Sequence, residues 1–318
     1  MRHRQLFRAL ALSCLVAGST AAVAAGPDDP VAAATQRAAR GGEGPYRALM
    51  TMDARLPTHT LYRPADLTAG PGRWPVIVWG NGACHNLGNR FRYFLTEIAS
   101  HGYVIIAIGP IGAQLVESKV ELTPEEAGRP AGAKSTTNWR QLIEAMDFAE
   151  AENAREGSAF HGRLDTKHIA VMGQSCGGLQ AITASADPRV TTSVIWNSGT
   201  FDNTSAALDG TDATRDSLKK LHAPIAYISG DSSDVAFKNS NADYALLAPT
   251  LPAFRGWAKG IGHTGTYRQP GGGLFTGVAL DWLDWQLKGD KQAAKRFTGK
   301  DCGLCKDGGW VVESRNLR

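Results

Sequence analysis

The sequence predicts an α/β fold with a mostly parallel central sheet that helices cover on both faces. Short runs rich in β-branched residues recur along the chain, and each is apolar throughout. Such runs are typical of strands buried on both faces of a parallel sheet. Segments with helical spacing of apolar residues separate these runs, and strands that alternate with helices form parallel, helix-covered sheets.

Each element of this prediction corresponds to a stretch of the chain. The expected strands are Pro75–Trp79, Tyr103–Ile108, His168–Met172, Thr192–Trp196 and Pro224–Ile228. The expected helices are Phe91–Ser100, Asn138–Asn153, Leu179–Ser185 and Phe275–Leu287. Two earlier stretches, Tyr46–Asp53 and His59–Tyr62, are expected to add an antiparallel pair at one edge of the sheet.

The N-terminal residues have the composition of a secretory leader. Three arginines flank the start of an apolar run, Ala9–Ala17, and small residues follow it at Ala22–Ala24. We interpret residues 1–24 as a signal peptide and expect a secreted or periplasmic protein. No later run reaches the roughly 20 apolar residues that a spanning helix needs, so no membrane span is expected.

The rest of the chain divides into three parts. Residues 25–45 contain Ala, Gly, Pro and charge without a hydrophobic period, and we expect a flexible linker there. Residues 46–297 carry the alternating pattern of the α/β domain. Residues 298–318 contain a Cys-x-x-Cys pair and the apolar Trp310–Val312, and we expect a stapled appendage packed on the core.

Charge and cysteine content restrict the partners of the protein. The formal charge is +4, and removing the three arginines of the leader lowers it by three, which leaves no basic excess to hold nucleic acid. An even number of cysteines remains after cleavage, which favours disulfides over metal ligands in an exported protein. Three pairings are possible among these four residues, Cys84, Cys176, Cys302 and Cys305.

The motif with the most chemical content is Gly173-Gln174-Ser175-Cys176-Gly177, which lies between an expected strand and a helical segment. A sharp strand-to-helix turn holds the serine in strained backbone geometry at the sheet edge, and the flanking glycines keep other side chains from colliding with it. The amides of the following helix face any negative charge that develops there. Ser175 is therefore the candidate nucleophile; the alternative is a glycine-rich turn without a catalytic role.

A serine nucleophile needs a base that accepts its proton and an acid that orients the base. When a serine at such a turn is catalytic, the acid and then the histidine follow it along the chain. His263 lies beyond the candidate acids, in the polar glycine-rich loop Gly260–Gly265, whereas the other histidines come earlier. His263 is therefore the candidate base.

Two aspartates compete for the role of the acid, because both follow the expected strand Pro224–Ile228. We prefer Asp234, which lies further into the loop and precedes the apolar Val235-Ala236, a pair expected to shield its carboxylate. Asp231 follows Gly230 and is typical of a turn residue whose side chain bonds its own backbone. Asp231 remains the alternative.

An oxyanion hole needs two backbone donors, and the residue after the nucleophile, Cys176, supplies one of them. The glycine turn after the strand Pro75–Trp79 is expected to supply the second from the amide of Ala83, although this segment is also consistent with a plain glycine turn. If both amides reach one oxyanion at about 3 Å, Cys84 lies close to Cys176. A Cys84–Cys176 disulfide and a Cys302–Cys305 disulfide are then favoured; the alternative leaves Cys176 as a buried free thiol.

Aromatic residues near the ends of these strands are candidates for a substrate pocket. Trp79 lies beside the oxyanion turn, Trp196 ends an expected strand, and Tyr267 follows the candidate base. Each of the three fits core packing equally well.

The chain resembles the α/β-hydrolase superfamily, and within it secreted enzymes of the dienelactone-hydrolase and cutinase-like polyester-hydrolase branch. The resemblance extends from Tyr46 to Lys288 and rests on the turn Gly80–Cys84, the strand-to-helix elbow Gly173–Gly178, the acid turn Gly230–Asp234 and the loop Gly262–Tyr267. It implies the α/β-hydrolase fold and a serine hydrolase. Dienelactone hydrolases use a cysteine nucleophile where this chain has Ser175, which argues against dienelactone chemistry.

Together the residues predict a secreted carboxylic-ester hydrolase that works through an acyl-enzyme, without a metal or organic cofactor. The expected partner is a small or polymeric ester. One alternative is an extracellular polyester or polyamide depolymerase with the same triad. Another alternative is a binding protein on a hydrolase scaffold. It is disfavoured because all three triad residues are present in the expected order.

Overall fold

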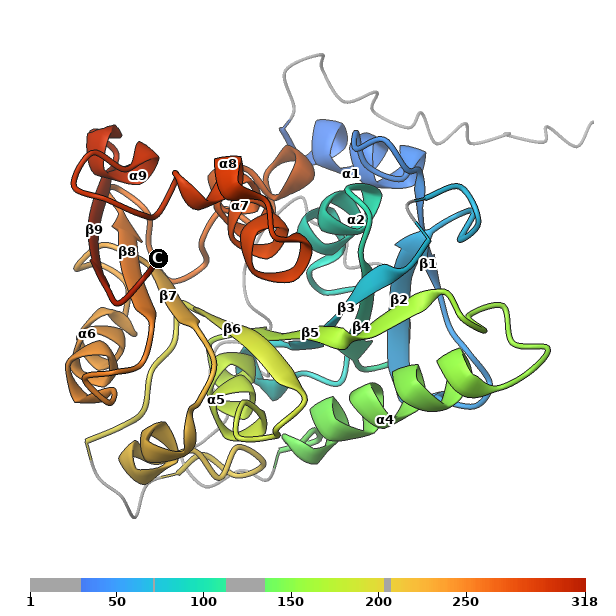
Figure 1. Ribbon diagram of the computed structural model, residues 1–318, viewed down its shortest axis with the longest axis horizontal. Helices are drawn as coiled ribbons and strands as arrows, with labels where there is room; N and C mark the ends of the chain where they lie inside the picture. The colour runs from blue at the N-terminus through green and yellow to red at the C-terminus, as the bar shows by residue number, and fades with distance from the viewer. Residues whose placement is uncertain (1–29, 71, 113–134, 203–206) are drawn as a thin grey trace, which may run out of the picture.

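The computed structural model describes residues 30–70, 72–112, 135–202 and 207–318, so the expected signal peptide lies outside the described residues. Within these ranges the strands form one nine-stranded sheet in the order β1-β2-β4-β3-β5-β6-β7-β8-β9 (Figure 1). The strands are β1 (Ala48–Thr51), β2 (His59–Pro64), β3 (Trp74–Gly80), β4 (Val104–Ile108), β5 (Leu164–Gln174), β6 (Val190–Trp196), β7 (Ile225–Gly230), β8 (Ala253–Ala258) and β9 (Trp310–Arg315).

Helices connect most of these strands. The α-helices are α1 (Pro30–Arg40), α2 (Arg92–Ser100), α4 (Arg140–Ala154), α5 (Cys176–Ala184), α6 (Phe237–Leu246), α7 (Leu274–Lys288), α8 (Lys291–Ala294) and α9 (Gly303–Lys306). The short 3-10 helices are η1 (Gly82–Cys84), η3 (Arg215–Lys220) and η4 (Pro270–Gly272).

The middle of the sheet is parallel. Pairing is parallel from β4 through β3, β5, β6 and β7 to β8. It is antiparallel between β1 and β2, between β2 and β4, and between β8 and β9. All residues of β3, β4 and β7 are buried, as their unbroken apolar sequences predict. The predicted α/β fold with a mostly parallel sheet is confirmed, as is the antiparallel pair at its edge.

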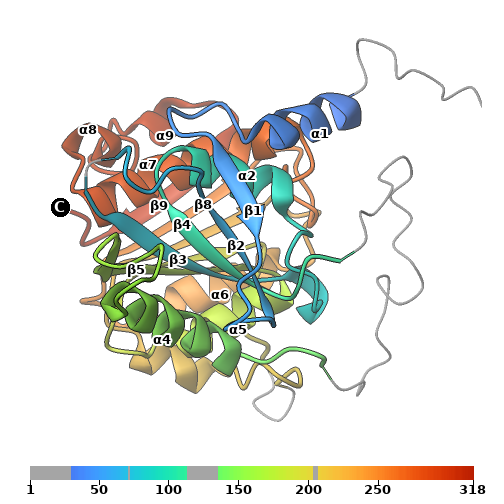
Figure 2. The same cartoon turned by 90° about the vertical axis from the view of Figure 1, so that its right-hand side faces the viewer.

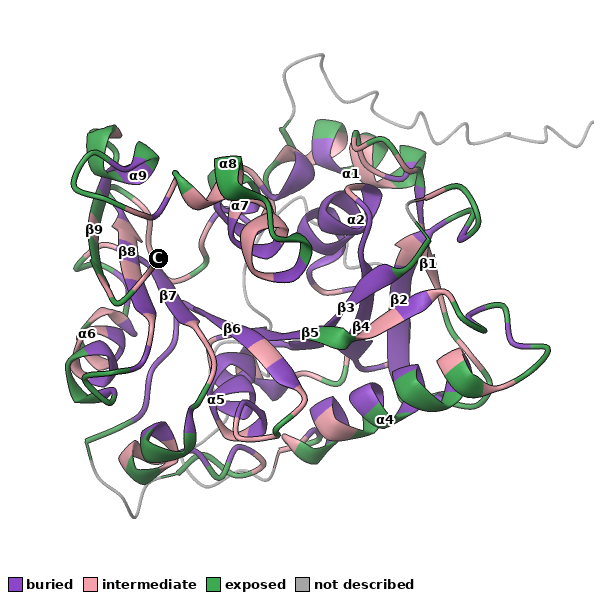
Figure 3. Cartoon of the chain, in the orientation of Figure 1, coloured by how far each residue is buried: buried purple, intermediate pink, exposed green. Residues whose placement is uncertain are grey.

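Helices pack on both faces of the sheet. α1, α2 and α7 lie on one side, and α4, α5 and α6 lie on the other (Figures 1 and 2). Each layer encloses an apolar core against the sheet; α2 is buried along its whole length, whereas α1 and α4 expose residues on their outward faces (Figure 3). Among the described residues, no helix is both long enough and apolar enough to cross a membrane.

The segment that we expected to be a flexible linker, residues 25–45, contains helix α1 within its described part. This helix buries Ala34, and its Arg37 guanidinium forms a two-point contact at 2.8 Å with the buried carboxylate of Glu97 on α2. The expectation was wrong for Pro30–Arg40, because buried Ala34, the Arg37–Glu97 ion pair and a Thr35–Tyr93 hydrogen bond at 2.8 Å hold this helix against α2.

The C-terminal residues are also more than an appendage. A Cys302–Cys305 disulfide closes the short helix α9, as predicted. Beyond it, Trp310–Arg315 form β9, which pairs antiparallel with β8 and completes the sheet. The expected boundary at residue 297 therefore separates two parts of one sheet.

Candidate active site

The candidate nucleophile lies on a tight turn between β5 and α5. Ser175 has φ 53° and ψ −118°, a left-handed conformation that is rare for residues with a side chain. A Cβ atom on Gly173 would lie 2.1 Å from the carbonyl oxygen of Gly177, and one on Gly177 would lie 2.1 Å from the backbone of Gly80. Both glycines are required because β3, β5 and the start of α5 approach one another at backbone distance.

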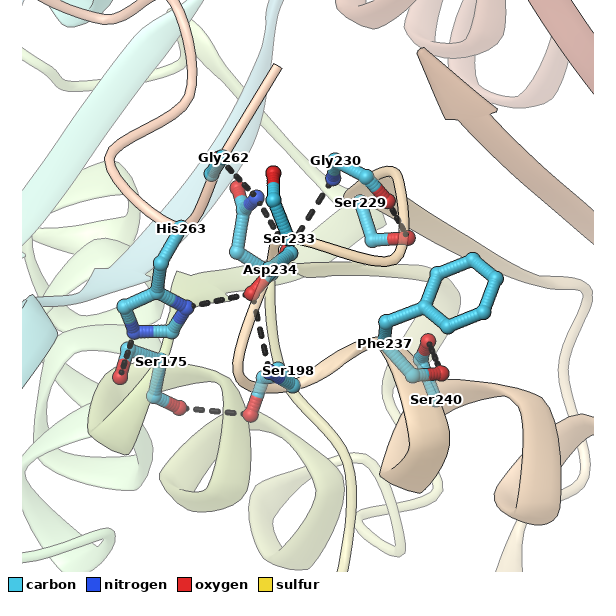
Figure 4. Close-up of polar contacts among 12 residues, drawn as sticks. Ser175, Ser198, Ser229, Gly230, Ser233, Asp234, Phe237, Ser240, Gly262 and His263 are labelled. Carbon is cyan, nitrogen blue, oxygen red and sulfur yellow. Dashed lines mark hydrogen bonds and ion pairs between the residues drawn. The ribbon is translucent and has the colours of Figure 1, made fainter. Parts of the chain in front are cut away.

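The structure brings Ser175, His263 and Asp234 into one line of hydrogen bonds (Figure 4). His263 Nε2 lies 2.9 Å from Ser175 Oγ, and His263 Nδ1 lies 2.7 Å from Asp234 Oδ1. The three residues follow β5, β8 and β7 respectively, at the carboxyl edge of the parallel strands. In this arrangement the imidazole can accept the hydroxyl proton while the carboxylate fixes the ring.

The carboxylate of Asp234 is fully buried and surrounded by donors. Its Oδ1 also accepts the amide of Ala236 at 2.9 Å, and its Oδ2 accepts the Asn197 side-chain amide at 2.7 Å and the Gly230 amide at 3.1 Å. Burial alone would raise the pKa of Asp234, but the hydrogen bonds from His263, Ala236 and Asn197 lower it below its ordinary value. The acid therefore stays ionised although it is enclosed by protein.

Asp231, the alternative acid, has a different environment. Its Oδ1 accepts the amide and the hydroxyl of Ser233, and its Oδ2 accepts the amide of Gly260 at 2.6 Å. These bonds close the turn and tie it to the loop after β8. The structure therefore places Asp234 against His263 and Asp231 in the turn.

The expected oxyanion turn lies beside the elbow. Ala83 is part of η1 and has φ 54°, and Asn81 anchors the turn because its buried side chain bonds the carbonyls of Ile108, Leu87 and His85. Cys176 begins α5, where the first amides of a helix have no intrahelical acceptor. Within the described ranges, neither the Ala83 nor the Cys176 amide donates a hydrogen bond to a backbone carbonyl of a turn or loop.

A disulfide joins the two turns. Cys84 and Cys176 are bonded, with 5.2 Å between their Cα atoms, as predicted. The bond links η1 to the first residue of α5. It thereby fixes the turn that carries Ala83 to the elbow that carries Ser175.

Three further residues support the site, and the sequence analysis missed them. Gln174 is buried and donates from Nε2 to the carbonyl of His263 at 3.1 Å. Ser198 donates to the carbonyl of Ser175 at 2.6 Å (Figure 4), and Asn197 bonds Asp234 as described above. The available signal was the strand-end sequence Asn197-Ser198, because the carboxyl ends of parallel strands meet at one edge of a sheet.

A cavity of about 390 Å³ opens over Ser175 and His263. Tyr267 lines it, as expected, whereas Trp79 and Trp196 do not. Both indoles are fully buried in the core, so their assignment to the pocket was wrong. The cavity is lined by Gly82, Ala83, Arg90, Phe91, Gln174, Ser175, Val235, His263, Thr264, Tyr267 and Arg268.

A larger cavity of about 720 Å³ lies between α4, the end of α5 and η3, and its lining residues include neither histidine nor cysteine. In the part of the chain that the structure describes, no three His, Cys, Asp or Glu side chains gather in a way that could hold a metal ion.

Comparison with known proteins gives one distant similarity. No family model matches the chain. The chain is similar to 20-hydroxy-prefusarin hydrolase FUS2 of Gibberella moniliformis (strain M3125 / FGSC 7600), with 27% identity over 139 residues. The match covers 43% of this chain and 29% of the fungal protein, which is named as a hydrolase.

Proposed function

We propose that the protein is a serine hydrolase of the α/β-hydrolase superfamily that cleaves carboxylic esters through an acyl-enzyme. The observation that carries the proposal is the continuous hydrogen-bonded line from Ser175 through His263 to Asp234. The strained turn under Ser175 and the distant similarity to a protein named as a hydrolase support it. The proposed family is the cutinase-like branch with a serine nucleophile.

In the proposed reaction, Ser175 Oγ attacks the ester carbonyl carbon while His263 Nε2 takes the hydroxyl proton. The negative charge on the carbonyl oxygen is stabilised by the amides of Ala83 and Cys176. Collapse of this intermediate breaks the bond to the alcohol, which leaves with the proton from His263. Water then attacks the acyl-enzyme with His263 as base again, and the acid and Ser175 are released.

Asp234 contributes throughout by holding the imidazole tautomer in which Nε2 is free to accept a proton. Because the Asp234 carboxylate is buried and receives donors from its surroundings, its negative charge is fixed opposite the imidazolium that forms. We also propose that the protein acts after export, in the periplasm or outside the cell. The two disulfides support this location.

The test uses p-nitrophenyl esters with acyl chains of increasing length, and p-nitroanilides of the same acyl groups. We expect turnover of esters, a pre-steady-state burst of p-nitrophenol from formation of the acyl-enzyme, and at most slow cleavage of anilides. Faster cleavage of the anilides would replace the ester assignment by an amidase. Failure to cleave either series, with Ser175 unreactive, would favour a binding protein.

A further inference from the structure

A chain of buried hydrogen bonds continues behind the acid. Tyr267 donates its hydroxyl to Asn197 Oδ1 at 2.5 Å, and Asn197 Nδ2 donates to Asp234 Oδ2 at 2.7 Å. Asp234 Oδ1 then contacts His263 Nδ1 at 2.7 Å. Tyr267, Asn197 and Asp234 are each at most 2% exposed, so water does not compete for these bonds.

We propose that Asn197 and Tyr267 are positioning residues that hold the Asp234 carboxylate in the orientation His263 needs. The proposal depends on the proposed serine-hydrolase function. Neither residue belongs to the triad or to the two oxyanion donors. They act through Asp234, on the side of the carboxylate that faces away from the imidazole.

The aromatic cluster beneath the site fixes the direction of the Tyr267 hydroxyl. The ring of Tyr267 packs edge-to-face against Phe91, Phe94 and Phe275, with centroid distances of 5.1, 5.2 and 5.4 Å. Burial and the nearby charge of Asp234 raise the pKa of Tyr267 well above its ordinary value. The phenol therefore stays protonated and remains a donor.

The Asn197 amide is held at both ends, because Tyr267 donates to its oxygen while its NH₂ group donates to Asp234 Oδ2 and, at 3.4 Å, to the Gly262 carbonyl. A side-chain amide has an oxygen end and an NH₂ end, and the donor from Tyr267 occupies the oxygen. The NH₂ end therefore faces Asp234; the opposite orientation would set the amide oxygen against the carboxylate. The backbone of Asn197 is also fixed, because φ is 43° and its amide bonds the Ile228 carbonyl at 2.7 Å.

The hydrogen bonds to the two carboxylate oxygens of Asp234 explain why the orientation of the Asn197 amide affects catalysis. The donors from Asn197 and Gly230 occupy Oδ2, which leaves Oδ1 directed at His263. Without the Tyr267 hydroxyl the amide oxygen loses its donor, the amide is held only through its NH₂ group, and its charge-assisted bond to the carboxylate is less firmly placed. A displaced carboxylate misaligns the imidazole during proton transfer.

The test is Tyr267→Phe, which removes the hydroxyl and retains the ring that lines the cavity. With p-nitrophenyl butyrate as substrate we expect kcat to fall about tenfold. KM should stay within about twofold of the original value, because the surface that contacts the substrate is unchanged. The matched control is Tyr103→Phe, which removes another buried phenol–carboxylate bond, from Tyr103 to Asp284 at 2.6 Å, away from the site.

A second arm separates positioning from general support of the fold. The rate of Ser175 labelling by a fluorophosphonate is compared for Tyr267→Phe alone and in an Asp234→Ala background. If the hydroxyl acts through Asp234, its removal has no further effect once the carboxylate is absent. A labelling rate in the double variant equal to that of Asp234→Ala alone, with Tyr103→Phe active, supports the proposal.

Four results would overturn the inference. These are an unchanged kcat in Tyr267→Phe, a change mainly in KM, an equal loss in both backgrounds, or an equal loss of kcat in Tyr103→Phe. Each of these would leave the serine-hydrolase assignment intact. Absence of Ser175 labelling in the unsubstituted protein would instead remove the proposed function and this inference with it.

Discussion

At the scale of single residues, the site depends on one buried charge that is fully hydrogen-bonded. A carboxylate inside a protein is costly unless donors surround it. Asp234 receives the imidazole, two backbone amides and a side-chain amide, so it is ionised and fixed in place before any substrate binds. Asp231 is bonded as well, but to its own turn, at the surface.

This difference predicts unequal effects of the same substitution. Asp234→Asn should lower kcat by about 10³-fold or more, because the imidazole loses the carboxylate that holds its tautomer and stabilises its protonated form. Asp231→Asn should retain activity within about tenfold. Steady-state kinetics on the two purified variants decide which aspartate is the acid. Comparable rates, or the reverse ranking, would mean that the other aspartate is the acid.

The nucleophile and the base should each be indispensable. Ser175→Ala and His263→Ala should lower ester cleavage by about 10³-fold or more, since residues of a triad act as a unit. Circular dichroism and thermal unfolding serve as the controls for the fold. If either folded variant retained most of its activity, the triad assignment would be wrong.

The sequence indicated Ser175 and His263 because a local motif and chain order suffice to single them out. The preference for Asp234 agrees with its place against His263, but the reason offered holds only for Ala236. Val235, expected to shield the carboxylate, is 79% exposed, and the enclosure comes from Asn197, Gly230 and Ala236. The role of Asn197 depends on two strand ends that meet only in the folded sheet.

At the scale of elements, two turns carry the proposed oxyanion donors, and a disulfide joins them. The core encloses β3 and β5 on both faces and owes little to this bond. The relative placement of Ala83 and Cys176, in contrast, depends on it. Catalysis should therefore be more sensitive to reduction than folding is.

Mild reductant should lower kcat before global unfolding is detected, because the amide donors lose their placement while the sheet stays packed. The measurement follows ester turnover and tryptophan fluorescence together during titration with dithiothreitol. The control is the double variant Cys302→Ser/Cys305→Ser, which lacks the tail disulfide and should lose activity in the same way. Loss of activity that coincides with unfolding, or that requires the tail disulfide, would contradict this account.

The ion pair between α1 and Glu97 should make the docking of α1 depend on pH. Burial opposes ionisation of Glu97, but its bonds and charge interactions with His101 and Arg37 lower its pKa from 4.5 to about 2. The part of this lowering that comes from His101 does not depend on α1, but the part that comes from Arg37 means that ionised Glu97 stabilises the docked α1 above pH 4.5. This stabilisation is lost as the pH falls toward 2.

Glu97→Gln should therefore increase amide hydrogen exchange in α1 at neutral pH, with a loss of roughly 2 kcal/mol in the free energy of local opening. It should also remove the acid dependence of α1 between pH 4.5 and 2. The matched control is Glu43→Gln, whose carboxylate contacts the same Arg37 at 2.8 Å but is half-exposed. Equal protection of α1 in Glu97→Gln and the unsubstituted protein would contradict the role of this ion pair.

The strands that the sequence predicts differ from those that it does not predict in how fully they are buried. The unbroken apolar runs of β3, β4 and β7 are buried from end to end, and the pattern predicts them. β8 contains Arg255 and Gly256, and β9 ends in a charged stretch, so neither has such a run. Both lie near the edge of the sheet, where side chains are partly exposed and the hydrophobic signal is weak.

At the scale of the whole molecule, the parallel sheet assembles the site by bringing distant strand ends to one edge. Ser175, Asp234 and His263 come from the ends of β5, β7 and β8, and the oxyanion turn follows β3. The sheet order places these ends along one edge, and helices cover both faces of the sheet (Figures 1 and 2). The alternation of strands and helices predicted this architecture, and the glycine motif around Ser175 predicted where on it the hydrogen-bonded line of Ser175, His263 and Asp234 lies.

The most direct test of the central claim is covalent labelling with a fluorophosphonate, mapped by mass spectrometry of a digest. A triad-activated serine at this edge should react rapidly and stoichiometrically, with the adduct on Ser175. His263→Ala should slow the reaction by orders of magnitude. An adduct on another residue, or none on Ser175 in the folded protein, would contradict the account.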